Sequence, residues 1–462
     1  MEQSFFKKTS MILIMIILLI IPLKLILGTI QERSYRNHNA YREISATWGA
    51  AQNITGPVLT IPYYDTNGKL RHANFLPQEL NVAADIKPEK RYRGIFEVIV
   101  YGSDISMAGT FARPDFSAWD IEPYQILWDK TVLILGINGL RGIQQIDTFQ
   151  WNGNPASLKP GQKPVLGIQG LTANIFSTSN KKGESPEDWF EETNLFRINF
   201  SIHGSREIKF TPAAEQTRVE IESSWPHPAF RGNYLPSQRT ITPEGFTASW
   251  QVSSFGRDYP GMWLSEEKSA AVFKSRLAGS QLGVELIQPV NFYTLSERSV
   301  KYGLLIIGLT FLCFFMFEIL NRLKIHPMQY LLVGFGLCIF YLLLISFSEH
   351  IGFLPAYMLS AAACIILITW YTRYFLNRIS ASLITGGVLA CFFSLFYIIL
   401  QHEGYSLVIG ASSLFFILTF VMWLTRKLDW YAVFKSAPGI KFKPFKSKRP
   451  AIEPKPVKGG TE

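Results

Sequence analysis

The chain has 462 residues, of which 48% are hydrophobic and 14% aromatic, and its formal net charge is +10. This length allows two or three domains, and the apolar content suits a protein that is about half embedded in a membrane. Residues 426–462 hold ten basic and three acidic residues, whereas residues 31–299 hold 27 basic and 28 acidic ones. The positive charge therefore belongs mainly to a terminal tail, and it gives no indication of nucleic-acid binding.

The first 30 residues have the pattern of a membrane anchor or a signal peptide. Lys7 and Lys8 precede an apolar segment, Met11–Ile30, that is interrupted only by Lys24. The residues after this segment lack the small-x-small pattern of a cleavage site, which favours an uncleaved anchor. Residues 1–30 are therefore predicted to be a cytoplasmic N-terminus followed by a transmembrane anchor helix, with the two lysines inside.

Residues 31–299 are predicted to form a large, mainly-β domain after a helical stalk from Gln31 to about Ala50. Three segments, 196–202, 218–222 and 246–252, alternate strictly between apolar and polar residues. Such strands have one dry and one wet face, which favours antiparallel sheets packed face to face in a sandwich-like fold. The run Val58–Ile61 between Pro57 and Pro62 predicts an edge strand, because proline cannot donate to a neighbouring strand.

Two short helices are expected within this domain. Ser185-Pro186-Glu187-Asp188 combines a cap, a first-turn proline and acidic residues at one helix start. Ser265-Glu266-Glu267 begins the second, which Gly279 is expected to end.

Five further apolar segments predict a helical membrane bundle over residues 300–425. They are 302–320, 328–347, 353–372, 379–400 and 405–425, and Glu318 is their only charged residue. Each is long enough to cross a hydrocarbon core of ~30 Å. Basic links alternate with turns that lack Lys and Arg, so the positive-inside rule orients every segment consistently.

The resulting fold class is a polytopic α-helical membrane protein with six transmembrane helices. Its mainly-β domain, residues 31–299, is inserted between the first and second helices and is predicted to be periplasmic. Both termini are predicted to be cytoplasmic, and the basic tail, 426–462, is predicted to be disordered.

The cysteines exclude a disulfide-stapled outer domain. All four, Cys313, Cys338, Cys364 and Cys391, fall within predicted membrane helices, and residues 31–299 contain none. We therefore expect neither a disulfide nor a cysteine-ligated metal in the outer domain, and we interpret the membrane cysteines as packing residues.

Known catalytic motifs such as His-Glu-x-x-His, Cys-x-x-Cys or a phosphate-binding glycine loop do not occur in the sequence. Two outward turns, Glu349-His350 and His402-Glu403, form the first candidate site. Carboxylates and imidazoles that meet there would form a proton relay or a metal site. The alternative is that these polar residues only cap helix ends at the membrane interface.

Two other segments have both a functional and a structural interpretation. Trp225-Pro226-His227-Pro228-Ala229-Phe230 suits a recognition loop built on Trp225, His227 and Phe230, or a rigid crossover between strands. Gly410-Ala411-Ser412-Ser413 is similar to the Gly-x-Ser nucleophile of intramembrane rhomboid proteases. The nearby histidines precede this serine, however, and small residues in membrane helices commonly serve close packing.

Several long segments of the chain resemble the CreD family of bacterial inner-membrane proteins, over residues from the anchor to about Tyr431. The segments that carry the resemblance are Trp225-Pro-His-Pro, Gly245-Phe-Thr-Ala-Ser-Trp-Gln, Gln288-Pro-Val, Glu297-Arg-Ser-Val-Lys-Tyr-Gly-Leu-Leu-Ile-Ile-Gly-Leu-Thr-Phe, Phe317-Glu, Ile325-His-Pro-Met-Gln-Tyr-Leu-Leu-Val-Gly, Ser348-Glu-His-Ile-Gly-Phe and Asp429-Trp-Tyr. The resemblance implies an inner-membrane protein linked to cell-envelope integrity and to a two-component envelope or carbon-source response. It implies no catalytic mechanism and no active-site residues.

Two functional classes remain open. The first is a non-enzymatic protein of the envelope or its stress response, which is anchored in the lipid bilayer and whose periplasmic domain binds an envelope protein or cell-wall partner. The alternative is a membrane transporter or intramembrane enzyme that acts through the helix bundle. The scarcity of ionisable residues inside the membrane favours the first, whereas a lipid or ligand bound between the helices would favour the second. No cofactor, metal or nucleic acid is expected, and the sequence does not determine the oligomeric state.

Overall fold

The computed structural model describes residues 2–161, 169–175, 190–265, 270–288, 292–320, 325–376, 379–402 and 404–426. The chain divides into two compact units. The helical unit comprises residues 1–29 and 294–462, and the β unit comprises residues 30–293. The sequence had placed the corresponding boundaries at 30/31 and 299/300.

A single helix, α1 (Glu2–Trp48), contains both the predicted anchor and the predicted stalk. Its segment 11–30 is apolar apart from Lys24, whereas the residues after Ile30 include charged side chains throughout, among them an exposed Arg36–Glu32 pair one turn apart. The chain therefore enters the β unit as a continuous helix.

The other long helices coincide closely with the predicted membrane segments. They are α4 (Gly303–Leu320), α5 (Pro327–Ile351), α6 (Phe353–Leu376), α7 (Ile379–Gln401) and α8 (Ser406–Thr425). A short amphipathic helix, α3 (Phe292–Lys301), precedes α4 and meets it at a bend of 44°. Over the described residues five helices qualify as membrane spans by length and composition, or six if α3 and α4 count as one.

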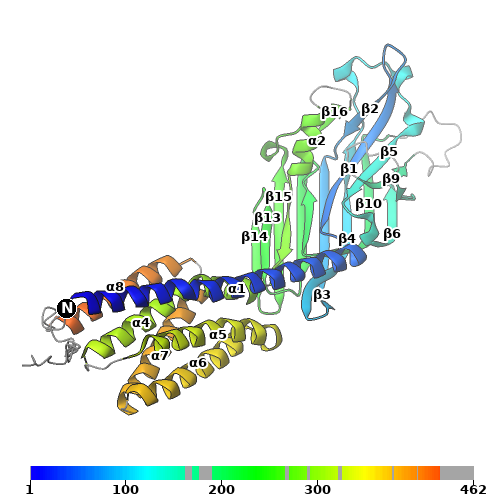
Figure 1. The fold of residues 1–462 in the computed structure, drawn as a ribbon. Helices are drawn as coiled ribbons and strands as arrows, with labels where there is room; N and C mark the ends of the chain where they lie inside the picture. Colours follow the sequence, from blue (N-terminus) through cyan, green and yellow to red (C-terminus); the bar gives the residue numbers. More distant parts are fainter. Residues whose placement is uncertain are drawn as a thin grey trace, which may run out of the picture. The chain divides into compact units, whose positions relative to one another are not determined.

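The helical unit is closely packed around α5, α6 and α7 (Figure 1). The rings of Phe340 on α5 and Phe393 on α7 lie 4.7 Å apart, and Tyr357 on α6 donates a hydrogen bond of 2.7 Å to the Phe393 carbonyl. By contrast, no residue of α8 is buried.

The β unit contains two sheets. The nine-stranded sheet has the order β13-β17-β11-β1-β5-β9-β8, with β2 paired to β1 and β16 paired to β2; the eight-stranded sheet has the order β14-β15-β12-β3-β4-β10-β6-β7 (Figure 1). The strands of the first sheet are β1 (Gln52–Tyr64), β2 (Leu70–Phe75), β5 (Val132–Ile137), β8 (Lys159–Pro160), β9 (Gly170–Asn174), β11 (Glu207–Thr211), β13 (Pro228–Gly232), β16 (Met262–Leu264) and β17 (Leu282–Leu286). Those of the second are β3 (Glu79–Arg93), β4 (Phe96–Ala112), β6 (Ile143–Trp151), β7 (Asn154–Pro155), β10 (Thr193–Ser205), β12 (Gln216–Ser223), β14 (Gln238–Thr242) and β15 (Gly245–Ser253).

The inward residues of both sheets form one hydrophobic core. Leu59 and Ile61 of β1 belong to the same buried cluster as Val82 of β3, Ile198 of β10 and Trp250 of β15. This arrangement agrees with the face-to-face sheets expected from the alternating segments. Most strand pairs are antiparallel, as expected from the alternating segments, and two are parallel, β1 with β11 and β3 with β12.

The prediction that Val58–Ile61 is an edge strand is wrong. These residues belong to β1, which has β5 on one side and β11 or β2 on the other. The two prolines are tolerated at interruptions of the ladder. Pro57 falls in a register shift between β1 and β5, and Pro62 lies beyond Thr60, the last residue of β1 paired with β5.

The described part of the β unit also contains one short α-helix and several 3-10 turns. They are α2 (Ala270–Gly279), which ends at Gly279 as expected, and the 3-10 turns Ser117–Trp119, Pro123–Gln125, Trp128–Lys130, Leu140–Gly142 and Ser254–Gly256. The helix expected at 185–188 and the start expected at 266–267 lie outside the described residues.

Candidate functional site

The two outward turns lie at matching ends of their helices. Glu349 and His350 occupy the last turn of α5, and His402 directly follows α7. Since α6 connects α5 to α7, both turns lie at the same end of the bundle. Glu349 is half-buried, His350 and His402 are exposed, and Glu403 lies outside the described residues.

Among the described residues no group of three or more His, Cys, Asp or Glu side chains is placed to hold an ion, but Glu403 of the second turn is not one of these residues. The metal-site hypothesis therefore stays a prediction. The proton-relay hypothesis remains a prediction.

The segment from Trp225 to Phe230 connects the two sheets, from the end of β12 to β13. The Trp225 indole donates a hydrogen bond of 2.9 Å to the Ile287 carbonyl, and the Phe230 ring packs edge-on against Trp250 at 5.8 Å. Both aromatic residues are therefore anchored in the domain. His227 is exposed, and its carbonyl accepts a hydrogen bond from Ile287. This geometry is that of a strand crossover, with His227 as its one exposed ring.

Ser413, the second of the two serines near the start of α8, is a packing residue between helices. Ser413 donates a hydrogen bond of 2.6 Å to the Ile409 carbonyl in its own helix. Together with Gly410, it faces α4 and α7 across a narrow space. This close approach accounts for Gly410 and Ser413 as packing residues. The serine of the Gly-x-Ser pattern is Ser412, which is exposed, and its role as a nucleophile stays a prediction.

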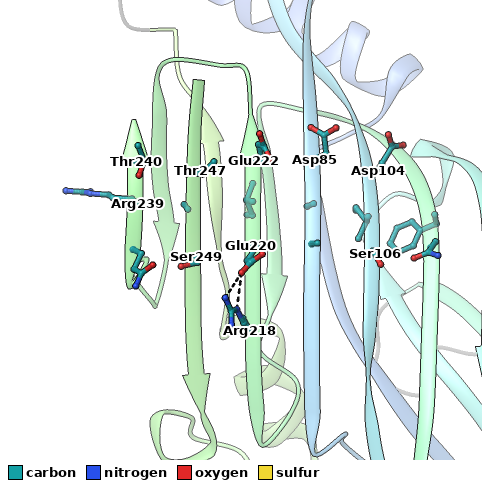
Figure 2. Close-up of a pocket in the computed structure, with 18 of the residues that line it drawn as sticks. Asp85, Asp104, Ser106, Arg218, Glu220, Glu222, Arg239, Thr240, Thr247 and Ser249 are labelled. Atoms are coloured by element: carbon teal, nitrogen blue, oxygen red, sulfur yellow. Dashed lines mark hydrogen bonds and ion pairs between the residues drawn. The ribbon is translucent and has the colours of Figure 1, made fainter. Parts of the chain in front are cut away.

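A broad hollow lies on the outer face of the eight-stranded sheet (Figure 2). Its volume is about 600 Å³, and the strands β14, β15, β12, β3, β4, β10 and β6 contribute to it. We call it the polar groove. In the middle row of the groove, Ala83 of β3 is the register partner of Ser106 on β4 and of Glu220 on β12. Glu220 is in turn the register partner of Ser249 on β15. Ala83, Ser106 and Ser249 are small, so this row leaves room above the sheet, while longer charged side chains such as Glu220 and Arg218 border it.

Three carboxylates lie side by side in the next row of the groove. Glu222 of β12 is the register partner of Asp85 on β3, which is the partner of Asp104 on β4, and Figure 2 shows them level with one another. Like charges directly opposite on neighbouring strands are destabilising. Lys87 compensates part of this charge, with its Nζ 2.6 Å from Asp104 and 3.6 Å from Asp85.

The pKa values follow from these contacts. The hydrogen bond from Lys87, followed by that from Ser201, lowers the pKa of Asp104 below its ordinary value. The same bond to Asp104 raises the pKa of Lys87. Both groups therefore remain charged at neutral pH.

The overall charge of the polar groove is negative. Its lining contains five carboxylates and two guanidinium groups, and one of the latter, on Arg218, is 2.7 Å from Glu220. The carboxylates, hydroxyls and amides of this face suit cationic groups and hydrogen-bond donors.

Part of α1 is held against one end of the β unit. The Trp48 indole stacks on His203 with ring centres 4.0 Å apart, and the Arg91 guanidinium lies 4.3 Å above the same indole. Ser45 shares a hydrogen bond of 2.8 Å with Ser205. Burial, and then the charge of Arg91, lowers the pKa of His203, so this ring is neutral at pH 7. The stack fixes where the helix joins the sheet.

Comparison with known proteins identifies the family. The family model described as "Inner membrane protein CreD" matches residues 4–431. The chain belongs to the CreD family.

A curated CreD relative supports this assignment over nearly the whole chain. The "Inner membrane protein CreD" of Escherichia coli (strain K12) is 28% identical over 444 residues, which cover 94% of this chain and 95% of the relative. Membership of CreD makes this chain an inner-membrane protein, in agreement with its long apolar helices.

Among solved structures, an M1 zinc metallopeptidase from Deinococcus radiodurans with a bound peptide substrate matches 46% of this chain and 42% of its own. Its sequence identity is 10% and its TM-score is 0.22, so this similarity carries no argument about fold or activity.

The polar groove of this CreD protein was not among the residues singled out from the sequence. The alternation in 197–201, 218–222 and 247–251 identified the wet faces of three of its strands. Which of these faces adjoin depends on the strand order, and that order places β3 between β12 and β4. A polar residue at every outward position of three strands was the signal available in the sequence.

Proposed function

We propose that this CreD-family protein is a non-enzymatic inner-membrane protein that supports cell-envelope integrity or the envelope stress response. In this proposal the β unit is periplasmic and binds an envelope partner, and the helices anchor it in the bilayer. The observation that carries the proposal is the polar groove, a concave face of about 600 Å³ on the outside of the sheet. Its net negative lining favours a partner that presents basic side chains.

The proposed orientation is supported by a contact within the helical unit. Lys8, near the start of α1, pairs with Glu318 at the end of α4, and its Nζ also donates to the Ile325 carbonyl at 3.1 Å. The N-terminal end of α1 and the link between α4 and α5 therefore lie at the same membrane level. That link carries Arg322 and Lys324 in the sequence, as expected of a cytoplasmic link.

The Lys8–Glu318 contact also helps to distinguish the anchoring proposal from the alternative, a transporter or intramembrane enzyme. Transporters commonly place ionisable groups near mid-membrane. In the described helices Glu318 pairs with Lys8 and accepts a hydrogen bond of 3.3 Å from Tyr330, close to the helix ends. This position supports a structural role and favours the anchoring interpretation.

Reversing charge in the groove tests the proposal. We expect Asp85→Lys combined with Glu222→Lys to abolish complementation of a strain that lacks the protein, under envelope challenge. We also expect the variant to lose at least about 80% of the partner captured by crosslinking in native membranes, since it repels basic groups.

The matched control is Glu192→Lys, which reverses an exposed charge that does not line the groove. It should complement fully and capture the partner at the wild-type level. Full complementation by the double variant at normal membrane abundance would contradict the groove as the binding site.

A further inference from the structure

A second hollow lies inside the helical unit, between α4, α7 and α8. Its volume is about 520 Å³, and its lining is apolar, with Leu312 and Met316 from α4, Val388 from α7, and Phe416 and Phe420 from α8. We call it the apolar cleft. All three helices are apolar over a membrane-spanning length, so the cleft lies at the depth of the hydrocarbon core.

The cleft is wedge-shaped along α8. Near the start of α8, Gly410 and Ser413 approach α4 and α7 so closely that only about 20 Å³ remains between the helices. Further along, from Phe416 to Leu424, the space widens to the full cleft. The cleft therefore occupies the half of the bilayer at the C-terminal end of α8, which is the cytoplasmic half in the orientation proposed above.

A cation is placed just beyond the wide end. Arg426 follows Leu424, the last cleft residue of α8, by two positions. Its guanidinium lies 5.3 Å from the centre of the ring of Trp423, which is exposed and does not line the cleft, so the long Arg426 side chain has to turn toward the cleft to meet a phosphate. Basic groups next to clefts between membrane helices attract anionic lipid headgroups. An apolar space of this size, in the range of ~300–1,000 Å³ typical of ligand sites, is filled favourably by a hydrocarbon chain.

We propose that the apolar cleft binds an anionic phospholipid of the adjoining leaflet, with one acyl chain between α4, α7 and α8 and the phosphate at Arg426. The lack of buried residues in α8 is consistent with this arrangement, because the lipid chain supplies packing that protein side chains do not. The site is independent of the polar groove and of any envelope partner.

The test uses full-length protein purified in mild detergent and equilibrated with an equimolar mixture of phosphatidylglycerol and phosphatidylcholine, followed by native mass spectrometry. We expect one retained phosphatidylglycerol per chain, at least tenfold over phosphatidylcholine. Val388→Trp should fill the cleft and abolish retention, whereas Arg426→Gln should keep a lipid but lose the preference for phosphatidylglycerol.

Val408→Trp is the matched control, because Val408 is exposed on α8 and does not line the cleft. It should retain phosphatidylglycerol like the wild type. If Val388→Trp does not accumulate, Cys391→Phe, at another lining position, serves as the second filling variant.

Equal retention by a filling variant and the wild type would overturn the site, as would no retained lipid in the wild type. An unaltered preference in Arg426→Gln, or retention of an uncharged isoprenoid in place of a phospholipid, would overturn the assignment of the headgroup.

Discussion

At the scale of single residues, Glu285 on β17 is a carboxylate paired with two arginines. The side chain of Glu285 is 11% exposed, and its carboxylate accepts hydrogen bonds of 2.6 Å from Arg206 and 2.9 Å from Arg231. Burial alone would raise its pKa, but the hydrogen bonds from the two arginines outweigh burial and hold the pKa below its ordinary value of 4.5. A depressed carboxyl pKa stabilises the fold above the unfolded-state pKa, and this contribution is lost as the pH falls through the folded-state pKa.

We therefore predict that Glu285→Gln lowers the free energy of unfolding by about 1–3 kcal/mol at pH 7, the range for hydrogen bonds to charged groups and for orphaned partners. The difference from the wild type should shrink as the pH falls below about 4.5, because the carboxyl of the unfolded chain is protonated there, and it should vanish once the pH passes below the lower pKa of the folded-state carboxyl. Urea unfolding of a fragment comprising residues 31–299 measures this, since the β unit has its own core and no cysteine. Glu192→Gln, at an exposed carboxyl, should show no difference at either pH; a pH-independent loss in Glu285→Gln would contradict the ion-pair explanation.

The outward turns give a second prediction at this scale. His350 and His402 are exposed at helix ends, so we expect His350→Ala combined with His402→Ala to cost at most about 1 kcal/mol of local stability and to leave complementation intact. The measurement is complementation under envelope challenge, with membrane abundance checked by immunoblot. Loss of protection at normal abundance would instead establish the proton-relay site.

At the scale of helices, α1 is held in the helical unit by close packing as well as by the Lys8–Glu318 pair. Leu19 is fully buried and lies where a side chain at Gly334 of α5 would project, with the ring of Phe311 also 3.2 Å from that point. Small residues allow membrane helices to approach closely, and van der Waals contact then stabilises the pair. Gly334 is therefore a packing residue, because a larger side chain at this position would collide with Leu19 and Phe311.

We predict that Gly334→Val destabilises the protein by about 1–3 kcal/mol, the usual cost of overpacking. The expected result is a lower melting temperature in detergent and less protein in the membrane. Gly308→Val on α4 is the control, because a side chain there meets open space. Equal melting temperatures for the two variants would show that α1 does not depend on this contact.

At the scale of the whole molecule, the two units offer separate binding chemistry. The β unit presents a polar, net acidic face, whereas the helical unit contains a wholly apolar cleft. A lipid bound between the helices would favour the transporter or enzyme class, unless it is retained unchanged as a structural component of the bundle. A lipid that is moved between leaflets or chemically altered would favour the transporter or enzyme class.

Topology is the prediction that belongs to this scale. Reporter fusions at Ser348, Gln401 and Thr425 should report periplasm, periplasm and cytoplasm, because basic residues are confined to alternate links. Their positions at the ends of α5, α7 and α8 make each fusion diagnostic of one crossing. Any other pattern would contradict six spans with both termini in the cytoplasm.

The sequence alone determined the helices of the bundle and the mainly-β character of the outer domain. The segments expected at 328–347 and 379–400 lie within α5 and α7, and the alternating segment 218–222 lies within β12. The length of an apolar segment is a local property, because a membrane helix makes its backbone hydrogen bonds within that segment. Period-two alternation is local as well, because successive side chains of a strand point to opposite faces of the sheet. They can therefore be recognised before any partner element is known.

Only the tertiary structure decided which elements adjoin. Pro57 and Pro62 indicated an edge strand, but β1 has neighbours on both sides because each proline coincides with an interruption in its ladder. The row formed by Glu222, Asp85 and Asp104 exists because β3 pairs in parallel with β12, a contact between residues more than a hundred positions apart. The apolar cleft likewise depends on the point at which α8 diverges from α4 and α7. Strand order, register and helix separation are set by packing between distant segments, and the local pattern of any one segment does not contain them.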